Sequence, residues 1–136
     1  MGKRRKSREL AVQHLFQDEI NPNGSKMHLK DLLDSAIPED VTDFYQELVS
    51  GVHQRIDDID TEIEKHSNNW RISRMAKVDL NILRVATFEL FYCNEIPASV
   101  TLNEAIEISK KFGSEDSPSF VNGVLDNILK HQKIPA

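Results

Sequence analysis

The segment from Ala76 to Cys93 constrains the fold of this chain more strongly than any other. On a helix, its apolar residues point in nearly every direction instead of forming one stripe. They are Val78, Leu80, Ile82, Leu83, Val85, Phe88, Leu90 and Phe91. Because a helix that is apolar on most sides has to be buried, this segment predicts a helix inside the protein.

The other long periodic segments are also helical, and no stretch alternates with the period of two that a half-buried strand requires. The longest apolar stripe follows Pro38 and predicts one helix of roughly seven turns. Its members are Val41, Phe44, Tyr45, Leu48, Val49, Val52, Ile56, Ile59 and Ile63. Gly51 lies inside this stripe, and a mid-helix glycine is less favourable than alanine by about 0.5–1 kcal/mol. We therefore expect another helix to cross closely at Gly51.

The N-terminal part predicts two further helices. The first runs from about Lys3 to Glu19 and ends at residues 21–24, where proline and glycine favour a turn. A short helix near residues 28–35 follows it. Residues 70–75 form a junction between the two halves of the chain.

Two more helices are delimited in the C-terminal part. One follows Pro97, with Thr101 and Glu104 as a predicted capping box, and Gly113 ends it. Ser117 is a favourable N-cap for the last helix, because proline stands at the next position. The sequence thus predicts an all-α protein.

Size and composition indicate one globular domain over residues 1–136. The chain is large enough to bury one core, and its 39% apolar and 29% charged residues are ordinary for a soluble protein. Its apolar runs are far shorter than the ~20 residues that span a bilayer, so we expect no membrane contact. Cys93 is the only cysteine, which excludes an internal disulfide and favours the reducing cytoplasm.

Motifs for catalysis or cofactor binding are not apparent. Cys93 lies in the buried segment, and no nearby motif supplies a base for it. The glycine-rich loops that cradle phosphates are missing from the sequence. Glu62 and His66 stand one helical turn apart, but a third metal ligand is not apparent, and a solvated helix face explains them more simply. We therefore expect no catalytic residue, no cofactor and no metal.

Positive charge is concentrated at the N-terminus. Residues 1–8 carry +5 in a chain whose net charge is −5, which leaves −10 on the remainder. The basic residues are Lys3, Arg4, Arg5, Lys6 and Arg8. A solubilising tail is one interpretation. However, the cluster runs directly into a helix, where guanidinium groups can bind phosphates and stack on unpaired bases, and this favours a polyanion site.

The turn from Gly113 to Phe120 carries side chains that suit single-stranded RNA. Such RNA is recognised through aromatic stacking and through polar groups that read base edges. Asp116, Ser117 and Phe120 could supply both. The simpler alternatives are that Phe120 is a core residue and that Ser117 only caps a helix.

Three segments together resemble the NusB family of bacterial transcription antitermination factors. They are TLNEAIEISKKFGSEDSPSFVNGVLD at 101–126, RRKSRELAVQHLF at 4–16 and WRISRMAKVDLNILRVATFEL at 70–90. Their order and spacing match the family over nearly the whole chain. The resemblance implies two small three-helix bundles packed across each other, with the halves at about residues 1–69 and 70–136.

The resemblance also implies a function. Such proteins bind boxA, a short single-stranded RNA element of ribosomal RNA operon leaders and phage nut sites, together with the ribosomal protein NusE. The complex joins RNA polymerase and other Nus factors and suppresses termination. The positions that match the family's RNA surface are Arg4, Arg5, Lys6, Arg8, Gln13, Phe16, Lys110, Asp116 and Phe120. The basic cluster and the turn add Lys3 and Ser117.

The family pattern further implies that NusE docks on the second half, with Asp79 and Ile82 as contacts. Other matching residues are interpreted as helix-packing and hydrogen-bonding groups: Arg84, Glu89, Asn103, Glu104 and Asn122. A homodimer of the free protein stays open. Two alternatives also remain, namely a protein-binding helical module without RNA specificity and the NusB-like domain of an RNA cytosine methyltransferase.

Overall fold

A computed structural model describes residues 2–22 and 37–132, and within these ranges the regular structure is entirely helical. The elements are α1 (Gly2–Ile20), α3 (Glu39–Gln54), α4 (Ile56–Lys65), the short 3₁₀ helix η1 (Ile72–Arg74), α5 (Lys77–Tyr92), α6 (Ala98–Phe112) and α7 (Ser117–Gln132). The all-α prediction is confirmed. The short helix predicted near residues 28–35 lies outside the described residues. None of the described helices is both long and apolar enough to cross a membrane.

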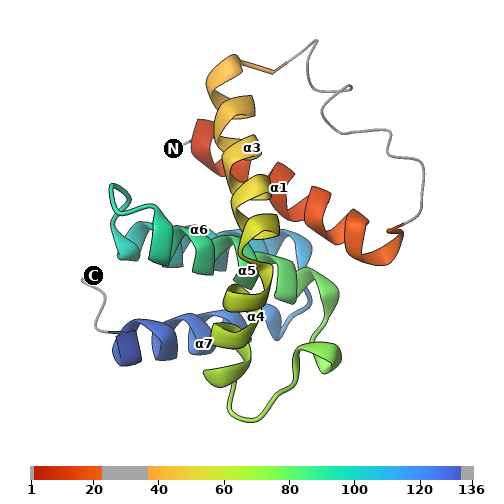
Figure 1. Cartoon of the computed structure of the whole chain (residues 1–136), viewed down its shortest axis with the longest axis vertical. Coiled ribbons are helices and arrows are strands. Elements are labelled where there is room, and N and C mark those ends of the chain that lie inside the picture. The colour runs from red at the N-terminus through yellow and green to blue at the C-terminus, as the bar shows by residue number, and fades with distance from the viewer. Residues whose placement is uncertain (1, 23–36, 133–136) are drawn as a thin grey trace.

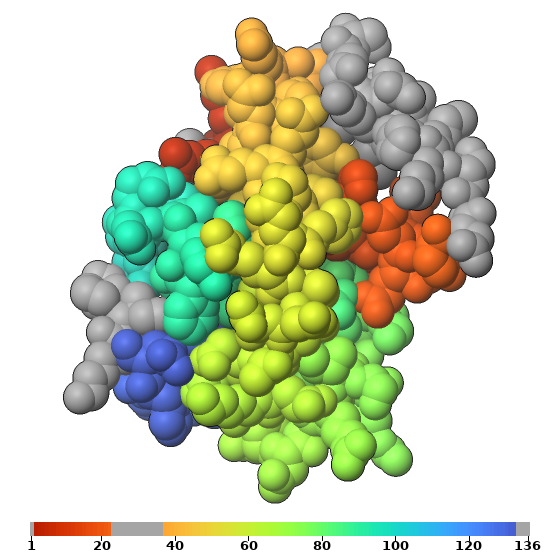
Figure 2. Space-filling view, in the orientation of Figure 1, coloured from red at the N-terminus to blue at the C-terminus, as the bar shows by residue number. Residues whose placement is uncertain are grey.

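Helix α5 lies at the centre of the molecule, as its all-round apolar pattern predicted. Every residue from Asp79 to Leu90 is buried. Helices α1, α3, α4, α6 and α7 all pack against α5, while α1 packs most extensively on α3, and α6 on α7 (Figure 1). In the space-filling view, α3 and α4 cover the side of α5 that faces the viewer (Figure 2). The molecule is therefore two groups of helices that share one buried helix.

Helices α3 and α5 approach each other closely at Gly51. A Cβ atom built on Gly51 would lie 2.3 Å from the ring of Phe88 on α5. No side chain fits in that space, so the aromatic ring packs directly on the backbone of α3. The predicted close crossing at Gly51 is confirmed.

The prediction of a single helix after Pro38 is wrong. The helix is interrupted at Arg55, and the segment forms two helices, α3 and α4. Arg55 separates them with φ −121° and ψ 23°, and its amide donates to the carbonyl oxygens of Gly51 and Val52. The Arg55 guanidinium carbon lies 4.1 Å from the ring centroid of Tyr92. This cation–π contact with Tyr92 of α5 stabilises the break between the two helices. Neither a glycine nor a proline at Arg55 indicates the break in the sequence.

Two predicted helix starts are also wrong in detail. Helix α6 begins at Ala98, so Thr101 and Glu104 lie beyond its first turn and cannot form a capping box. Both side chains instead bond to other helices. Helix α7 begins at Ser117 itself, whose hydroxyl accepts a hydrogen bond from the Ser114 amide at 2.9 Å. Ser117 therefore closes the preceding turn.

Candidate nucleic-acid interface

Helix α1 is exposed at its start and enters the core at Ser7, and the basic residues divide between these two parts. Residues Ser7 to Val12 are buried. The Ser7 hydroxyl donates to the carbonyl oxygen of Val41 at 2.8 Å, which fixes α1 against the start of α3. Lys3, Arg4 and Lys6 are exposed before the helix enters the core.

Arg8 lies inside the protein and is 3% exposed. Its Nε and Nη2 atoms each donate to a different carboxylate oxygen of Glu89 at 2.8 Å. Its Nη1 atom donates to Glu104 at 3.3 Å. This bidentate pair uses the guanidinium fork that RNA binding would need. The structure therefore departs from the expectation that Arg8 contacts phosphate, and Arg8 instead connects α1 with α5 and α6.

Arg5 is half-buried and forms a second, parallel ion pair. Its Nε atom donates to Oε1 of Glu104 at 3.0 Å, and its Nη2 atom also contacts that carboxylate. The hydrogen bond from Arg5 holds the pKa of Glu104 below its ordinary value, and the same bond raises the pKa of Arg5. The buried carboxylate of Glu104 thus neutralises part of the positive charge of the basic cluster.

Arg4 and Lys6 are the basic side chains of this cluster that form no ion pair with any described residue. The Arg4 guanidinium carbon lies 4.9 Å from the ring centroid of Phe44, so the ring holds it in place without neutralising it. Lys3 pairs with Asp40 at 3.2 Å, where both side chains are solvated and the interaction is weak. Positive charge available to a polyanion therefore comes chiefly from Arg4 and Lys6, with Lys3 nearby.

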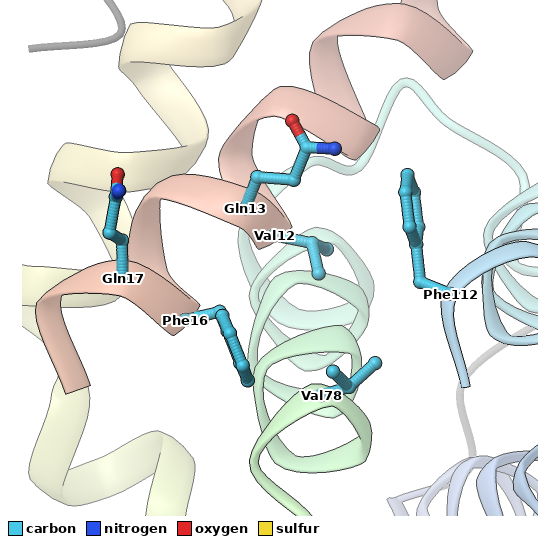
Figure 3. A pocket seen from close by; sticks show the side chains of 6 residues that line it. All are labelled: Val12, Gln13, Phe16, Gln17, Val78 and Phe112. Carbon is cyan, nitrogen blue, oxygen red and sulfur yellow. The ribbon is translucent and has the colours of Figure 1, made fainter. Parts of the chain in front are cut away.

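A hollow of about 400 Å³ lies between α1, the start of α5 and the end of α6. Figure 3 shows Gln13 and Phe16 of α1 on one side and Phe112 of α6 on the other. The lining residues are Val12, Gln13, Phe16, Gln17, Val78 and Phe112. Its volume is in the range of ligand sites, and a mostly apolar wall with a few amides suits a base or another planar group. The hollow adds Phe112, which no sequence motif singled out as a site residue.

The turn after α6 is held close to this hollow. Lys111 pairs with Glu9 of α1 at 3.1 Å, which joins the end of α6 to the middle of α1. Gly113 is required in the turn, because a Cβ atom there would lie 2.4 Å from the Ser117 hydroxyl. Lys110 is exposed and pairs with Glu107 on its own helix.

Of the other residues predicted in the turn, Asp116 is exposed, Phe120 is half-buried and Ser117 is 1% exposed. The ring of Phe120 packs edge-on against Trp70, with the ring centroids 6.2 Å apart. Asp116 and Phe120 are therefore accessible in whole or in part. Ser117 departs from the expectation of an RNA contact because it is buried within the turn.

Cys93 is not arranged for catalysis, and Glu62 and His66 are not arranged to bind a metal. Burial raises the pKa of Cys93 to about 12, so its thiol stays protonated at neutral pH. His66 is buried, and its Nδ1 atom lies 2.9 Å from the carbonyl oxygen of Glu62. Among the residues that the structure describes, no cluster of acidic, histidine or cysteine side chains is arranged to hold a metal.

Comparisons with known proteins place the chain in a family. A model of the NusB family matches residues 5–130. The chain belongs to the NusB family. It is 50% identical to the transcription antitermination protein NusB of Geotalea daltonii, with 94% of each chain covered. It is 44% identical to the transcription antitermination protein NusB of Desulfatibacillum aliphaticivorans, with 96% of this chain and 92% of the relative covered.

Solved structures of NusB proteins agree. NusB of T. maritima matches with a TM-score of 0.86 at 36% identity, over 93% of this chain and 90% of that one. The complex of antitermination factors NusB and NusE with dsRNA contains a chain that matches with a TM-score of 0.84 at 26% identity, over 96% and 98%. The matched NusB relatives are named as antitermination proteins and not as enzymes.

The two positions that the family pattern assigns to NusE are both buried, and they differ in polarity. Asp79 lies in the first turn of α5 beside Val78, which lines the hollow. It is 8% exposed, and within the described residues its Oδ1 atom has no hydrogen-bond partner. Ile82 is 1% exposed and belongs to the core, so its side chain is not available as a docking contact in this structure.

The interpretation of the NusB-type polar residues as packing groups holds for three of the five. Arg84 joins Asp60 of α4 to Glu19 of α1, with its Nε atom 2.8 Å from Asp60. Glu89 and Glu104 hold the arginines of α1 as described above. Asn103 and Asn122 are exposed, so the packing interpretation is wrong for them.

Proposed function

We propose that this protein is an RNA-binding adaptor of transcription antitermination that binds boxA RNA together with NusE. The observation that carries the proposal is the face of α1 that holds Lys6, Gln13 and Phe16. Lys6, Gln13 and Phe16 are spaced by seven and three residues, which places them on one face of a helix. A cation, an amide and an aromatic ring thus follow one another towards the hollow opposite Phe112. Single-stranded RNA requires this combination of groups.

The ribosomal partner NusE is proposed to dock near Asp79. A buried carboxylate oxygen without a partner is unfavourable, and a donor from another protein would relieve that cost. Asp79 also adjoins the hollow through Val78, so a protein bound there would lie beside the RNA. The relative solved with both NusE and dsRNA supports a composite surface of this kind.

This complex would join the bound transcript to RNA polymerase and the other Nus factors in the cytoplasm. No covalent step is required. The protein is proposed to act by tethering alone, which agrees with relatives that are named as antitermination proteins. A homodimer of the free protein would compete with the complex if it covered the same surface.

Electrostatics favour a two-protein site over binding by this chain alone. Arg4 and Lys6, the two cations without an ion-pair partner among the described residues, can neutralise only a few phosphates, whereas the body beyond residue 8 carries −10. We expect weak and salt-dependent binding of RNA by the isolated protein. Added basic surface from NusE should tighten it.

The test is fluorescence anisotropy of a labelled boxA RNA, titrated with this protein, with NusE and with both, against a scrambled RNA of equal length. Tight, sequence-selective binding only with both proteins is the expected result. Equal affinity for the two RNAs, or no binding even with NusE present, would leave a helical protein-binding module and would overturn the proposal. Tight binding of boxA by the isolated protein would contradict its composite nature.

A further inference from the structure

Trp70 is the only tryptophan of the chain, and it is 52% exposed. It stands in the segment between α4 and η1, which projects at the lower end of the molecule (Figures 1 and 2). Burial of a large aromatic side chain lowers its free energy. A tryptophan left half in solvent on an ordered segment therefore requires an explanation. One edge of it packs on Phe120, and the remainder is free for another planar group.

A second hollow of about 700 Å³ lies around this tryptophan. Unlike the hollow beside α1, its wall is polar. The lining residues are Glu64, Lys65, Asn68, Asn69, Trp70 and Arg71. Two cations, two amides and an exposed ring are the groups that bind phosphate, read base edges and stack on bases. The one acid of the wall is already engaged, because Glu64 accepts a hydrogen bond from the Ile72 amide at 2.9 Å.

The backbone of this segment is held in an uncommon conformation. Asn68 and Asn69 have φ values of 49° and 71°, in the left-handed region that few residues other than glycine adopt. Backbone strain of this type clusters at functional sites. Asparagine tolerates it better than most residues and also presents an amide, whereas glycine would give the turn alone.

Hydrogen bonds fix the segment at both ends. The Ser67 hydroxyl donates to the carbonyl oxygen of Ile63, and the Trp70 amide donates to that of Ser67 at 3.0 Å. Asn127 of α7 donates to the carbonyl oxygen of His66 at 3.2 Å. Trp70 is therefore presented on a fixed loop, which lowers the entropic cost of binding a ligand.

We propose that this hollow is a further contact site for single-stranded RNA, which takes a nucleotide that flanks the boxA core. Trp70 stacks on the base, Asn68 and Asn69 hydrogen-bond to its edge, and Lys65 and Arg71 neutralise the adjoining phosphates. The site is continuous with the turn at Phe120, because the two rings touch. This inference rests on the RNA-binding function proposed above and extends the path of the RNA past α7.

The emission of Trp70 provides the direct test, since the chain has no second tryptophan. The wild-type protein with NusE is titrated with the boxA core and with boxA extended by a few nucleotides at either end. Stacking should quench the emission with one extended RNA and not with the core. A tryptophan that only supports Phe120 would show no such difference.

Substitutions give an independent measurement. Trp70→Ala should weaken binding of the extended RNA about tenfold, the loss typical of one stacked base, and leave the core RNA unaffected. Trp70→Phe should retain most of the affinity. Because Trp70→Ala removes packing from Phe120, the surface variant Lys65→Gln/Arg71→Gln is measured too. It should lower the salt slope for the extended RNA, whereas the control Lys130→Gln, whose side chain is 70% exposed on α7, should not.

The outcomes separate the two proposals. If anisotropy shows selective boxA binding but neither Trp70 emission nor these variants respond to the extensions, the further site is overturned and the main function stands. If NusE alone changes the emission and Trp70→Ala weakens NusE binding, the surface binds protein, which also overturns it. If no boxA binding occurs at all, the main function has failed.

Discussion

The exposed first turn of α1 and the buried turn that follows it carry the same kind of side chain and use it in opposite ways. Arg8, in the buried turn, is enclosed by two carboxylates from α5 and α6. Arg4, one turn earlier on the same side of the helix, lies over the same Phe44 ring as Arg8 but has no carboxylate partner among the described residues. A guanidinium that is fully engaged inside the protein stabilises the fold, whereas one left unpaired at the surface attracts phosphate.

The comparison shows that the charge count of a basic cluster overstates its capacity for RNA. Five basic residues lie within the first eight, yet Arg8 is neutralised inside the protein and Arg5 is paired with Glu104. Glu89 lies in the buried helix α5 and Glu104 on the buried side of α6, and a buried carboxylate requires a cationic partner. Substitutions in the buried and exposed parts of α1 should therefore separate stability from RNA binding.

The largest expected effect is in the buried turn of α1. Arg8→Gln leaves Glu89 without its bidentate partner at a site where the carboxylate is 1% exposed. Removal of one member of a buried pair should lower the free energy of unfolding by about 3–5 kcal/mol. Urea denaturation followed by circular dichroism measures it. Arg4→Gln is the matched control, with an expected change within about 0.5 kcal/mol; equal losses for both variants would erase the distinction between the buried and exposed parts of α1.

A smaller loss is expected at Glu104, with a pH dependence. Glu104→Gln should lower stability at neutral pH by about 1.5–3 kcal/mol, since hydrogen bonds to charged groups are lost. The pKa of Glu104 is lowered in the folded protein, so its contribution is complete above the ordinary value of 4.5 and is lost as pH falls through the folded pKa. Unfolding curves of wild type and variant should therefore converge in acid. A constant difference down to the acid range would exclude this linkage.

At the exposed end of α1 the effect should appear in binding and not in stability. Arg4→Gln/Lys6→Gln removes two cations that no described carboxylate engages. Loss of two phosphate contacts to a single strand should weaken boxA binding about 20-fold near 0.1 M salt. Anisotropy with NusE present measures the affinity, and thermal unfolding should change little. A variant that unfolds early but binds RNA normally would reverse the roles of the two parts of α1.

The finest distinction lies within the hollow beside α1. Gln13→Ala removes an exposed amide at its rim and should weaken boxA more than a scrambled RNA. The expected discrimination is about 1 kcal/mol, the value of one hydrogen bond. Gln17→Ala, on the same helix and the same hollow, tests whether the amide that points away from Phe112 in Figure 3 contributes equally.

Much of the architecture was predictable because it follows from helical periodicity. The apolar residues of α5 predicted its burial, and Gly51 predicted the close crossing that Phe88 fills. The break at Arg55 was not predictable, since the apolar stripe continues through it and the stabilising contact comes from Tyr92, far along the chain. Tertiary contacts decide such breaks, and local pattern does not contain them.

Sequence reasoning could name candidate residues for the site but could not tell which of them are buried. Helical spacing placed Arg4 and Arg8 on one side of α1, yet it could not show that the core begins between them. The same limit applies to Ser117 and Ile82, which the structure buries. Trp70 is the opposite case, because its ring is exposed in the structure. Its position in a junction between helices did not predict that exposure.

The salt dependence of boxA affinity tests the central claim most directly. The logarithm of the association constant of the complex with NusE is measured against the logarithm of salt concentration, for wild type, Arg4→Gln/Lys6→Gln and Lys130→Gln. If the exposed N-terminal end of α1 holds the phosphates, the slope should become shallower by about 1.4 in the double variant, or about 0.7 for each lost contact to a single strand, and stay unchanged in the control. An unchanged slope in the double variant would contradict the account, because Arg4 and Lys6 would then not meet the RNA backbone.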